Sequence, residues 1–238
     1  MPTEAFRGDK KAGQSLLGPV ERRFIDFLTP RFPRFVEGWH LTLVTLVWSA
    51  LTIVFGWLAA DDDAWLWAMS AVVVGQWFTD SFDGSLGKHR KRGLIKWGFF
   101  MDHLLDFVFM CSILIAWAFL LDGWDERLML WLVPVYGTFM VSSFLGYGAT
   151  QEFKITFLGI GPTETRIGFV GLNTALIVWG TGWLEQALPW VLVGSLVLLV
   201  FIVSRSSTYI WRMDMAEKAA RLAAEAAGAA DAGHVEDE

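Results

Sequence analysis

Six long apolar segments constrain the fold of this chain more than any other feature. A helix needs about 20 apolar residues to cross the hydrocarbon core of a bilayer. Segments close to this length lie at residues 41–60, 64–83, 98–121, 128–149, 166–184 and 187–211. In a chain of 238 residues they leave little room for a separate soluble domain. The sequence therefore predicts an all-α polytopic membrane protein with six transmembrane helices.

Basic residues gather in alternate connections between these segments. They precede the first segment, fill the connection between the second and third, flank the loop before the fifth and follow the sixth. Because cytoplasmic loops carry an excess of Lys and Arg, this pattern places both termini and the second-to-third loop in the cytoplasm. The short chain shows no targeting features, which favours a bacterial inner (cytoplasmic) membrane protein.

The two ends of the chain differ in composition from the six-span domain, which we place at residues 39–213. Residues 1–38 form a cytoplasmic segment with a predicted helix, either interfacial and amphipathic or packed on the membrane helices. The apolar face of that helix carries Val20, Phe24, Phe27 and Leu28. Residues 214–238 are rich in Ala and Glu and predict a frayed helix that runs into an acidic cytoplasmic tail.

Four aspartates stand beside the second-to-third loop, next to long apolar runs. Asp80 and Asp83 are three residues apart and Asp102 and Asp106 are four apart, so each pair shares one face of a helix. A carboxylate costs about 2.5–3.5 kcal/mol at the centre of a membrane helix, so a compensating cation is expected. Carboxylate oxygens suit hard divalent ions, which predicts a site for Mg²⁺ or Mn²⁺.

Two glycines and a basic run accompany the aspartates. Gly84 follows Asp83 directly and Gly98 precedes Asp102 by four residues, which allows close approach of a substrate or a turn. Lys88 is the basic residue nearest to Asp83 and has the length to reach a phosphate group. The alternative is that the basic run serves only to retain the loop in the cytoplasm.

The motif DxxDGxxGK, followed after nine residues by GxxxDxxxD, resembles the signature of the CDP-alcohol phosphotransferase family. Gly87 and Lys88 stand where that family carries Ala-Arg. The resemblance implies transfer of a phosphoryl-bearing group from a CDP-linked donor to a lipid or small-alcohol hydroxyl, with release of CMP. It also implies that the protein forms a homodimer and contacts membrane lipids. Metal ligation falls to Asp80, Asp83, Asp102 and Asp106, and Asp106 is also the expected base.

Two further segments suggest which classes of donor and acceptor the chain uses. The segments MDHLLD, which contains His103, and GPTE at 161–164 are similar to parts of choline and ethanolamine phosphotransferases. They slightly favour a headgroup donor with a lipid acceptor over CDP-diacylglycerol with a small alcohol, and they add Glu164 as a substrate contact. Thr42 takes the place of a contact that many members make through an Asn. His103 is a rival base, and GPTE has the alternative of an ordinary helix start.

Two other classes of function remain open at this stage. A membrane cation transporter or channel also uses intramembrane acids, although it would spread them through several spans. A structural membrane protein would only pair the aspartates with nearby Lys and Arg. No feature indicates a nucleic-acid partner.

Overall fold

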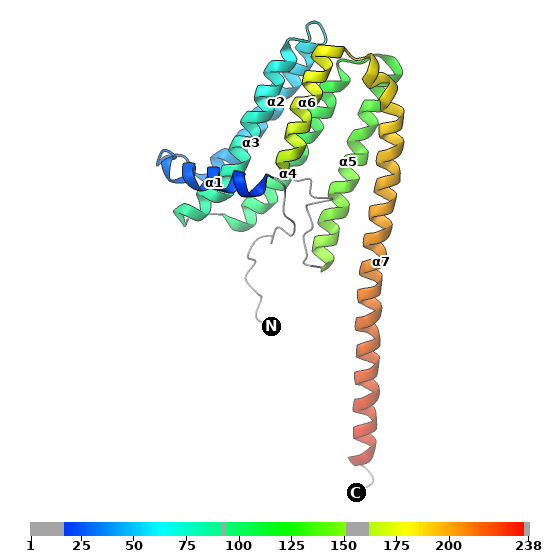
Figure 1. Cartoon of the computed structure of the whole chain (residues 1–238). Helices are drawn as coiled ribbons and strands as arrows, with labels where there is room; N and C mark the ends of the chain where they lie inside the picture. Colours follow the sequence, from blue (N-terminus) through cyan, green and yellow to red (C-terminus); the bar gives the residue numbers. More distant parts are fainter. Residues whose placement is uncertain (1–16, 92–93, 151–161, 236–238) are drawn as a thin grey trace.

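The computed structural model describes residues 17–91, 94–150 and 162–235, and all secondary structure within them is helical. This confirms the all-α prediction. The first elements are α1 (Gly18–Leu28) and the short 3-10 helix η1 (Thr29–Arg31). Six longer helices follow (Figure 1): α2 (Gly38–Ala59), α3 (Trp65–Arg90), α4 (Ile95–Ala118), α5 (Gly123–Thr150), α6 (Pro162–Trp179) and α7 (Gly182–Val235).

Helices α2 to α7 correspond in order to the six predicted segments. Four of them, α2, α4, α5 and the Gly182–Ala226 part of α7, are long and apolar enough to cross a membrane. In α3 and α6 polar residues such as Asp80 and Arg166 interrupt the apolar sequence. The chain is therefore an integral membrane protein with four candidate spans, and the six-span arrangement stays a prediction.

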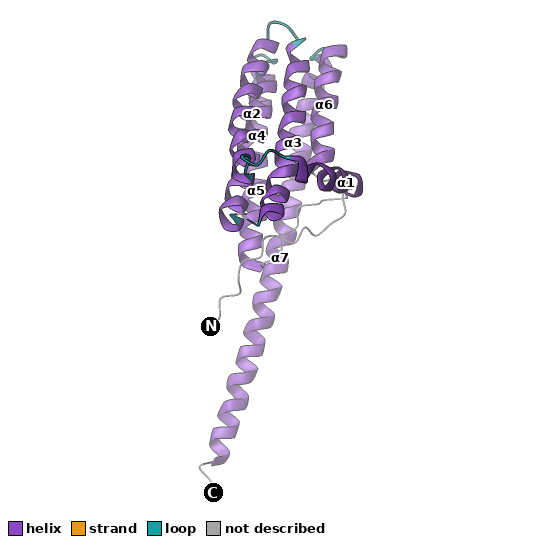
Figure 2. Ribbon diagram, turned by 90° about the vertical axis from the view of Figure 1, so that its left-hand side faces the viewer, coloured by secondary structure: helices purple, strands orange, loops and turns teal. Residues whose placement is uncertain are grey.

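Helices α2, α3, α4 and α6 lie side by side, and α5 runs with α7 beside them (Figures 1 and 2). The connections from α2 to α3, α4 to α5 and α6 to α7 meet at one end of the bundle (Figure 1). The ends of α3 and α5 and the starts of α4 and α6 lie toward the other end, where α1 crosses the bundle (Figure 1). The charge pattern of the sequence predicts that this second end faces the cytoplasm.

The boundary between the last two predicted segments is wrong by several residues. The sequence predicted one helix over 166–184, whereas α6 ends at Trp179 and α7 begins at Gly182. Gly180 has φ +69°, a backbone conformation that ends a helix readily when the residue is glycine. Helix α7 then continues without a break to Val235, well past the predicted end of the sixth segment at residue 211.

The apolar core lies toward the end of the bundle away from the aspartates. Its fully buried members include Leu66, Met69, Ile113, Met129 and Leu176, from four different helices. A second, smaller cluster joins Leu41, Phe82 and Leu86 under α1 and the η1 region. The polar residues of α3 around Asp80 lie between these two apolar clusters.

Two glycines of α2 allow it to approach its neighbours closely. A Cβ at Gly56 would overlap the backbone and side chain of Ala116 in α4. A Cβ at Gly38 would overlap the main-chain carbonyl of Asp83 in α3. Helix α2 is therefore pressed against both helices that carry the aspartates.

Helix α1 packs on the bundle through one polar and one aromatic contact set. Glu21 accepts hydrogen bonds from Ser81 Oγ of α3 at 3.1 Å and from Thr163 Oγ1 of α6 at 2.9 Å. The ring of Phe24 stacks on Trp77 with centroids 6.1 Å apart. These contacts show that α1 packs on the helices of the bundle. Phe27 on the same helix is exposed, and an interfacial position of α1 remains a prediction.

Candidate active site and metal centre

Three of the four predicted aspartates come together. Asp80 of α3 and Asp102 and Asp106 of α4 each present one carboxylate oxygen, and these three oxygens all lie within 4.8 Å of one another. All three residues are partly buried. The four-residue spacing places Asp102 and Asp106 on one face of α4. Asp80 joins them because α3 and α4 both pack against α2.

Asp83 lies beside this cluster and has its own partners. Oγ1 of Thr42 in α2 donates a 2.7 Å hydrogen bond to Oδ2 of Asp83. The backbone N–H of Gly84 donates to Oδ1 of the same carboxylate. Thr42 thus contacts an aspartate of the motif, and this position of the hydroxyl links α2 to the site.

Arg166 reaches the acidic cluster from α6, one helical turn after Pro162. Its Nη2 lies 2.8 Å from Oδ2 of Asp80 and 3.4 Å from Oδ1 of Asp106. Its Nε donates to Oε1 of Gln76 at 2.7 Å, and the Gln76 amide lies 3.5 Å from Oδ1 of Asp106. One guanidinium therefore connects α3, α4 and α6 at the aspartates.

From the sequence alone, Arg166 is one of the basic residues that indicate topology, and Gln76 is not among the predicted site residues. A usable signal existed for the amide, because Gln76 stands four residues before Asp80 and seven before Asp83, on the same helical face. For Arg166 the signal was weaker. An arginine four residues inside an apolar helix needs a partner, but the sequence does not say which one.

His103 contacts helix backbone and aromatic rings. Its Nδ1 lies 2.7 Å from the carbonyl oxygen of Phe99 and 3.8 Å from Oδ2 of Asp102. The ring centroids of Phe99 and Phe144 lie 4.4 and 5.4 Å from the centroid of the imidazole, respectively. These contacts favour a packing role, and its role as a base stays a prediction.

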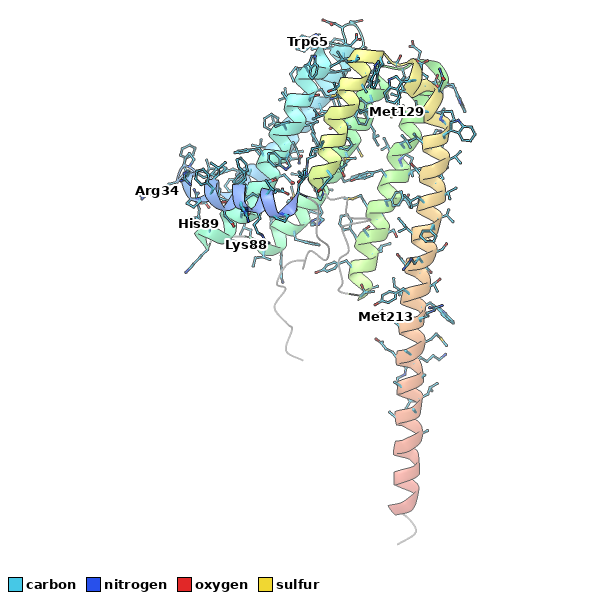
Figure 3. The ribbon with its side chains drawn as sticks, viewed as in Figure 1. Arg34, Trp65, Lys88, His89, Met129 and Met213 are labelled. Carbon is cyan, nitrogen blue, oxygen red and sulfur yellow. The ribbon has the colours of Figure 1, made fainter. Side chains whose placement is uncertain are left out.

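The other predicted substrate contacts lie around the cluster. Lys88 is exposed, and Figure 3 places it with His89 at the end of α3 farthest from Trp65. An added Cβ at Gly84 or Gly98 would meet no protein atom within 4 Å, so open space adjoins both residues. Glu164 accepts a 3.0 Å hydrogen bond from the backbone N–H of Leu17, while Gly161 of the GPTE segment lies outside the described residues.

Comparison with protein families identifies the chain. The model of the CDP-alcohol phosphatidyltransferase family matches residues 40–203, which cover most of the sequence and every aspartate of the cluster. The chain belongs to the CDP-alcohol phosphatidyltransferase family. Phospho-alcohol transfer from a CDP-alcohol is the reaction of this transferase family. A search among curated proteins finds no match.

Members of the CDP-alcohol phosphatidyltransferase family generally depend on a divalent metal, and the residues present fit such an ion. The cluster of Asp80, Asp102 and Asp106 offers three carboxylate oxygens, the ligand type that hard divalent cations prefer. Their mutual separation of at most 4.8 Å allows one ion to contact all three. This donor set suits Mg²⁺ or Mn²⁺ better than zinc.

Proposed function

We propose that this chain transfers a phospho-alcohol or phosphatidyl group from a CDP-linked donor to a hydroxyl acceptor and releases CMP. The observation that carries the proposal is the convergence of Asp80, Asp102 and Asp106 within 4.8 Å at the positions of the family motif. We place this site at the cytoplasmic face of a bacterial inner membrane and expect a homodimer. The basic connections at the same end of the bundle support that orientation.

The proposed roles combine the family resemblance, which includes Asp83 among the metal ligands, with the contacts of the side chains. Asp80, Asp83, Asp102 and Asp106 hold the metal, which when bound neutralises the negative charge of the pyrophosphate and of the departing CMP. Asp106 accepts the proton of the acceptor hydroxyl, and the bonds of Gln76 and Arg166 to its Oδ1 fix the plane of its carboxylate. Thr42 fixes Asp83 in the same way.

We assign the binding of the two substrates to residues near the end of α3 and the starts of α4 and α6. Gly84 and Gly98 border free space, so a substrate can approach the helix backbone there. Lys88 is exposed and its ammonium group is suited to a phosphate of the donor. Glu164 lies at the start of α6, two residues before Arg166, and accepts a hydrogen bond from the backbone N–H of Leu17, the residue before α1.

One experiment tests the function and separates the two donor classes. The purified chain is incubated with Mg²⁺ and either a CDP-amino-alcohol plus diacylglycerol or CDP-diacylglycerol plus a small alcohol, and CMP release and the mass of the lipid product are recorded. We expect product in the first arm in slight preference to the second. Asp214→Asn is the matched control for the cluster variant Asp102→Asn, because Asp214 is an exposed aspartate of α7 away from the cluster.

If the folded, unchanged protein releases CMP in neither arm, the proposed transfer is wrong. A cation flux measured in liposomes that contain the same protein would then favour the transporter or channel alternative. Product formation that survives Asp102→Asn would remove the acidic cluster from the reaction.

A further inference from the structure

Arg166 provides a positive charge inside the acidic cluster that comes from the protein itself. Its side chain is 10% exposed, and its guanidinium contacts Asp80 and Asp106, two of the three clustered carboxylates. Three carboxylates within 4.8 Å of one another repel strongly in a partly buried site. A buried guanidinium bonded to two of them removes much of that repulsion.

The orientation of Arg166 is fixed by more than its charge partners. Gln76 accepts from Nε at 2.7 Å and Asp80 accepts from Nη2 at 2.8 Å, so two nitrogens of the guanidinium are bonded to α3. Gln76 is fully buried and its amide also approaches Asp106. A planar guanidinium with several fixed donors suits such a shared position, whereas a lysine ammonium is a single flexible point charge.

We propose that Arg166 is a positioning residue that serves as an internal counter-cation: it keeps Asp80 and Asp106 assembled before a metal ion binds and lowers the affinity of that ion. The inference rests on the proposed metal role of these aspartates. Its physical basis is that Arg166 contacts the same carboxylates that a divalent ion would use. The protein's cation and the ion therefore repel each other while they share ligands.

This arrangement predicts two effects of opposite sign. Without Arg166 the unloaded cluster holds uncompensated negative charge, so the metal-free protein loses stability. The same loss of positive charge removes a repulsion that acts over a few ångströms, so a divalent ion binds more tightly. A residue that served only as packing material would lower stability without tightening metal binding.

The test measures Mn²⁺ binding to the purified full chain by electron paramagnetic resonance, together with its melting temperature in EDTA and in Mn²⁺. Arg166→Met and Arg166→Gln are expected to melt at lower temperature in EDTA and to bind Mn²⁺ about tenfold or more tightly than the unchanged protein. Arg166→Lys keeps the charge and is expected to stay within about threefold of the original affinity.

Asn173→Ala is the matched control for damage to α6. Asn173 is buried on the same helix and bonds Trp117 and Ser70, away from the aspartates. We expect this variant to lower the melting temperature and to leave the Mn²⁺ affinity unchanged.

The outcomes separate this inference from the proposed function. If the unchanged protein binds no Mn²⁺, the metal role of the cluster fails and the inference fails with it. If it binds Mn²⁺ but both neutral variants bind with equal or lower affinity, the counter-cation role alone is wrong. The same conclusion follows if Arg166→Lys tightens binding as much as Arg166→Met, or if neither neutral variant folds even in Mn²⁺.

Discussion

Oγ1 of Thr42 donates a 2.7 Å hydrogen bond to Oδ2 of Asp83 and so joins α2 to the motif helix α3. Hydrogen bonds to charged groups contribute about 1.5–3 kcal/mol. We expect Thr42→Val, which keeps the shape and removes the donor, to lower the rate of CMP release by about tenfold. Thr42→Ser keeps the hydroxyl and should retain most of the activity.

Thr52→Val is the control for this substitution. The hydroxyl of Thr52 lies on the same helix and bonds the carbonyl of Trp48, far from the aspartates. Its replacement should leave CMP release close to that of the unchanged protein. Equal loss in both variants would mean that the effect comes from α2 packing and that the bond to Asp83 has no functional role.

Glycines near the site should divide into two groups by their surroundings. Gly38→Ala places a Cβ against the carbonyl of Asp83 and forces α2 away from α3, so a clear fall in melting temperature is expected. Gly84→Ala and Gly98→Ala meet no protein atom, and because alanine favours helices over glycine by up to about 1 kcal/mol, these variants should be as stable or slightly more stable.

The same two variants test whether substrate occupies the open space. If a CDP-linked donor approaches Gly84 and Gly98 closely, each added methyl group should raise KM for the donor several-fold while the melting temperature holds. Unchanged KM in both variants would remove these glycines from the binding surface.

Asp106 and His103 should respond differently to substitution. Asp106→Asn keeps an oxygen that can accept from Arg166 and Gln76, so the protein should fold and bind the CDP-linked donor, but transfer should be abolished because an amide does not take up the acceptor proton. His103→Gln loses contacts with Phe99 and Phe144 and should reduce the rate by less than about tenfold. The reverse ranking in single-turnover measurements would make His103 the base.

Removal of divalent ions should stop transfer completely. The cluster of Asp80, Asp102 and Asp106 offers oxygen ligands, and chelation by EDTA leaves the pyrophosphate charge without a metal to neutralise it. Addition of Mg²⁺ or Mn²⁺ should restore CMP release. Full activity in EDTA, after dialysis against a metal-free buffer, would show that the reaction needs no divalent ion.

Local patterns in the sequence predicted the helices and the aspartates well because both depend on neighbours a few residues apart. The apolar segments predicted the order of α2 to α7, and the i, i+4 spacing predicted that Asp102 and Asp106 share one face of α4. The approach of Asp80 to this pair depends on the packing of α3 and α4 against α2. The end of α6 was misplaced because the predicted segment continued through Gly180, whose positive φ ends the helix.

The contacts of Arg166 could not be predicted in this way. They join residues 60 and 86 positions apart in the chain, to Asp106 and Asp80 respectively. Such pairings depend on how α6 packs against α3, and no periodicity in a single segment contains that information. For the same reason the sequence did not reveal that Glu21 joins α1 to Ser81 and Thr163.

The polar character of α3 and α6 has a consequence for the way this protein enters a membrane. Neither helix is apolar enough to be a candidate span by itself, yet Arg166 of one bonds Asp80 of the other. A charged side chain that is paired costs much less in a bilayer than an unpaired one. If both helices cross the membrane as the sequence predicts, we expect them to insert stably only together, so that the insertion of α3 is completed after α6 has been synthesised.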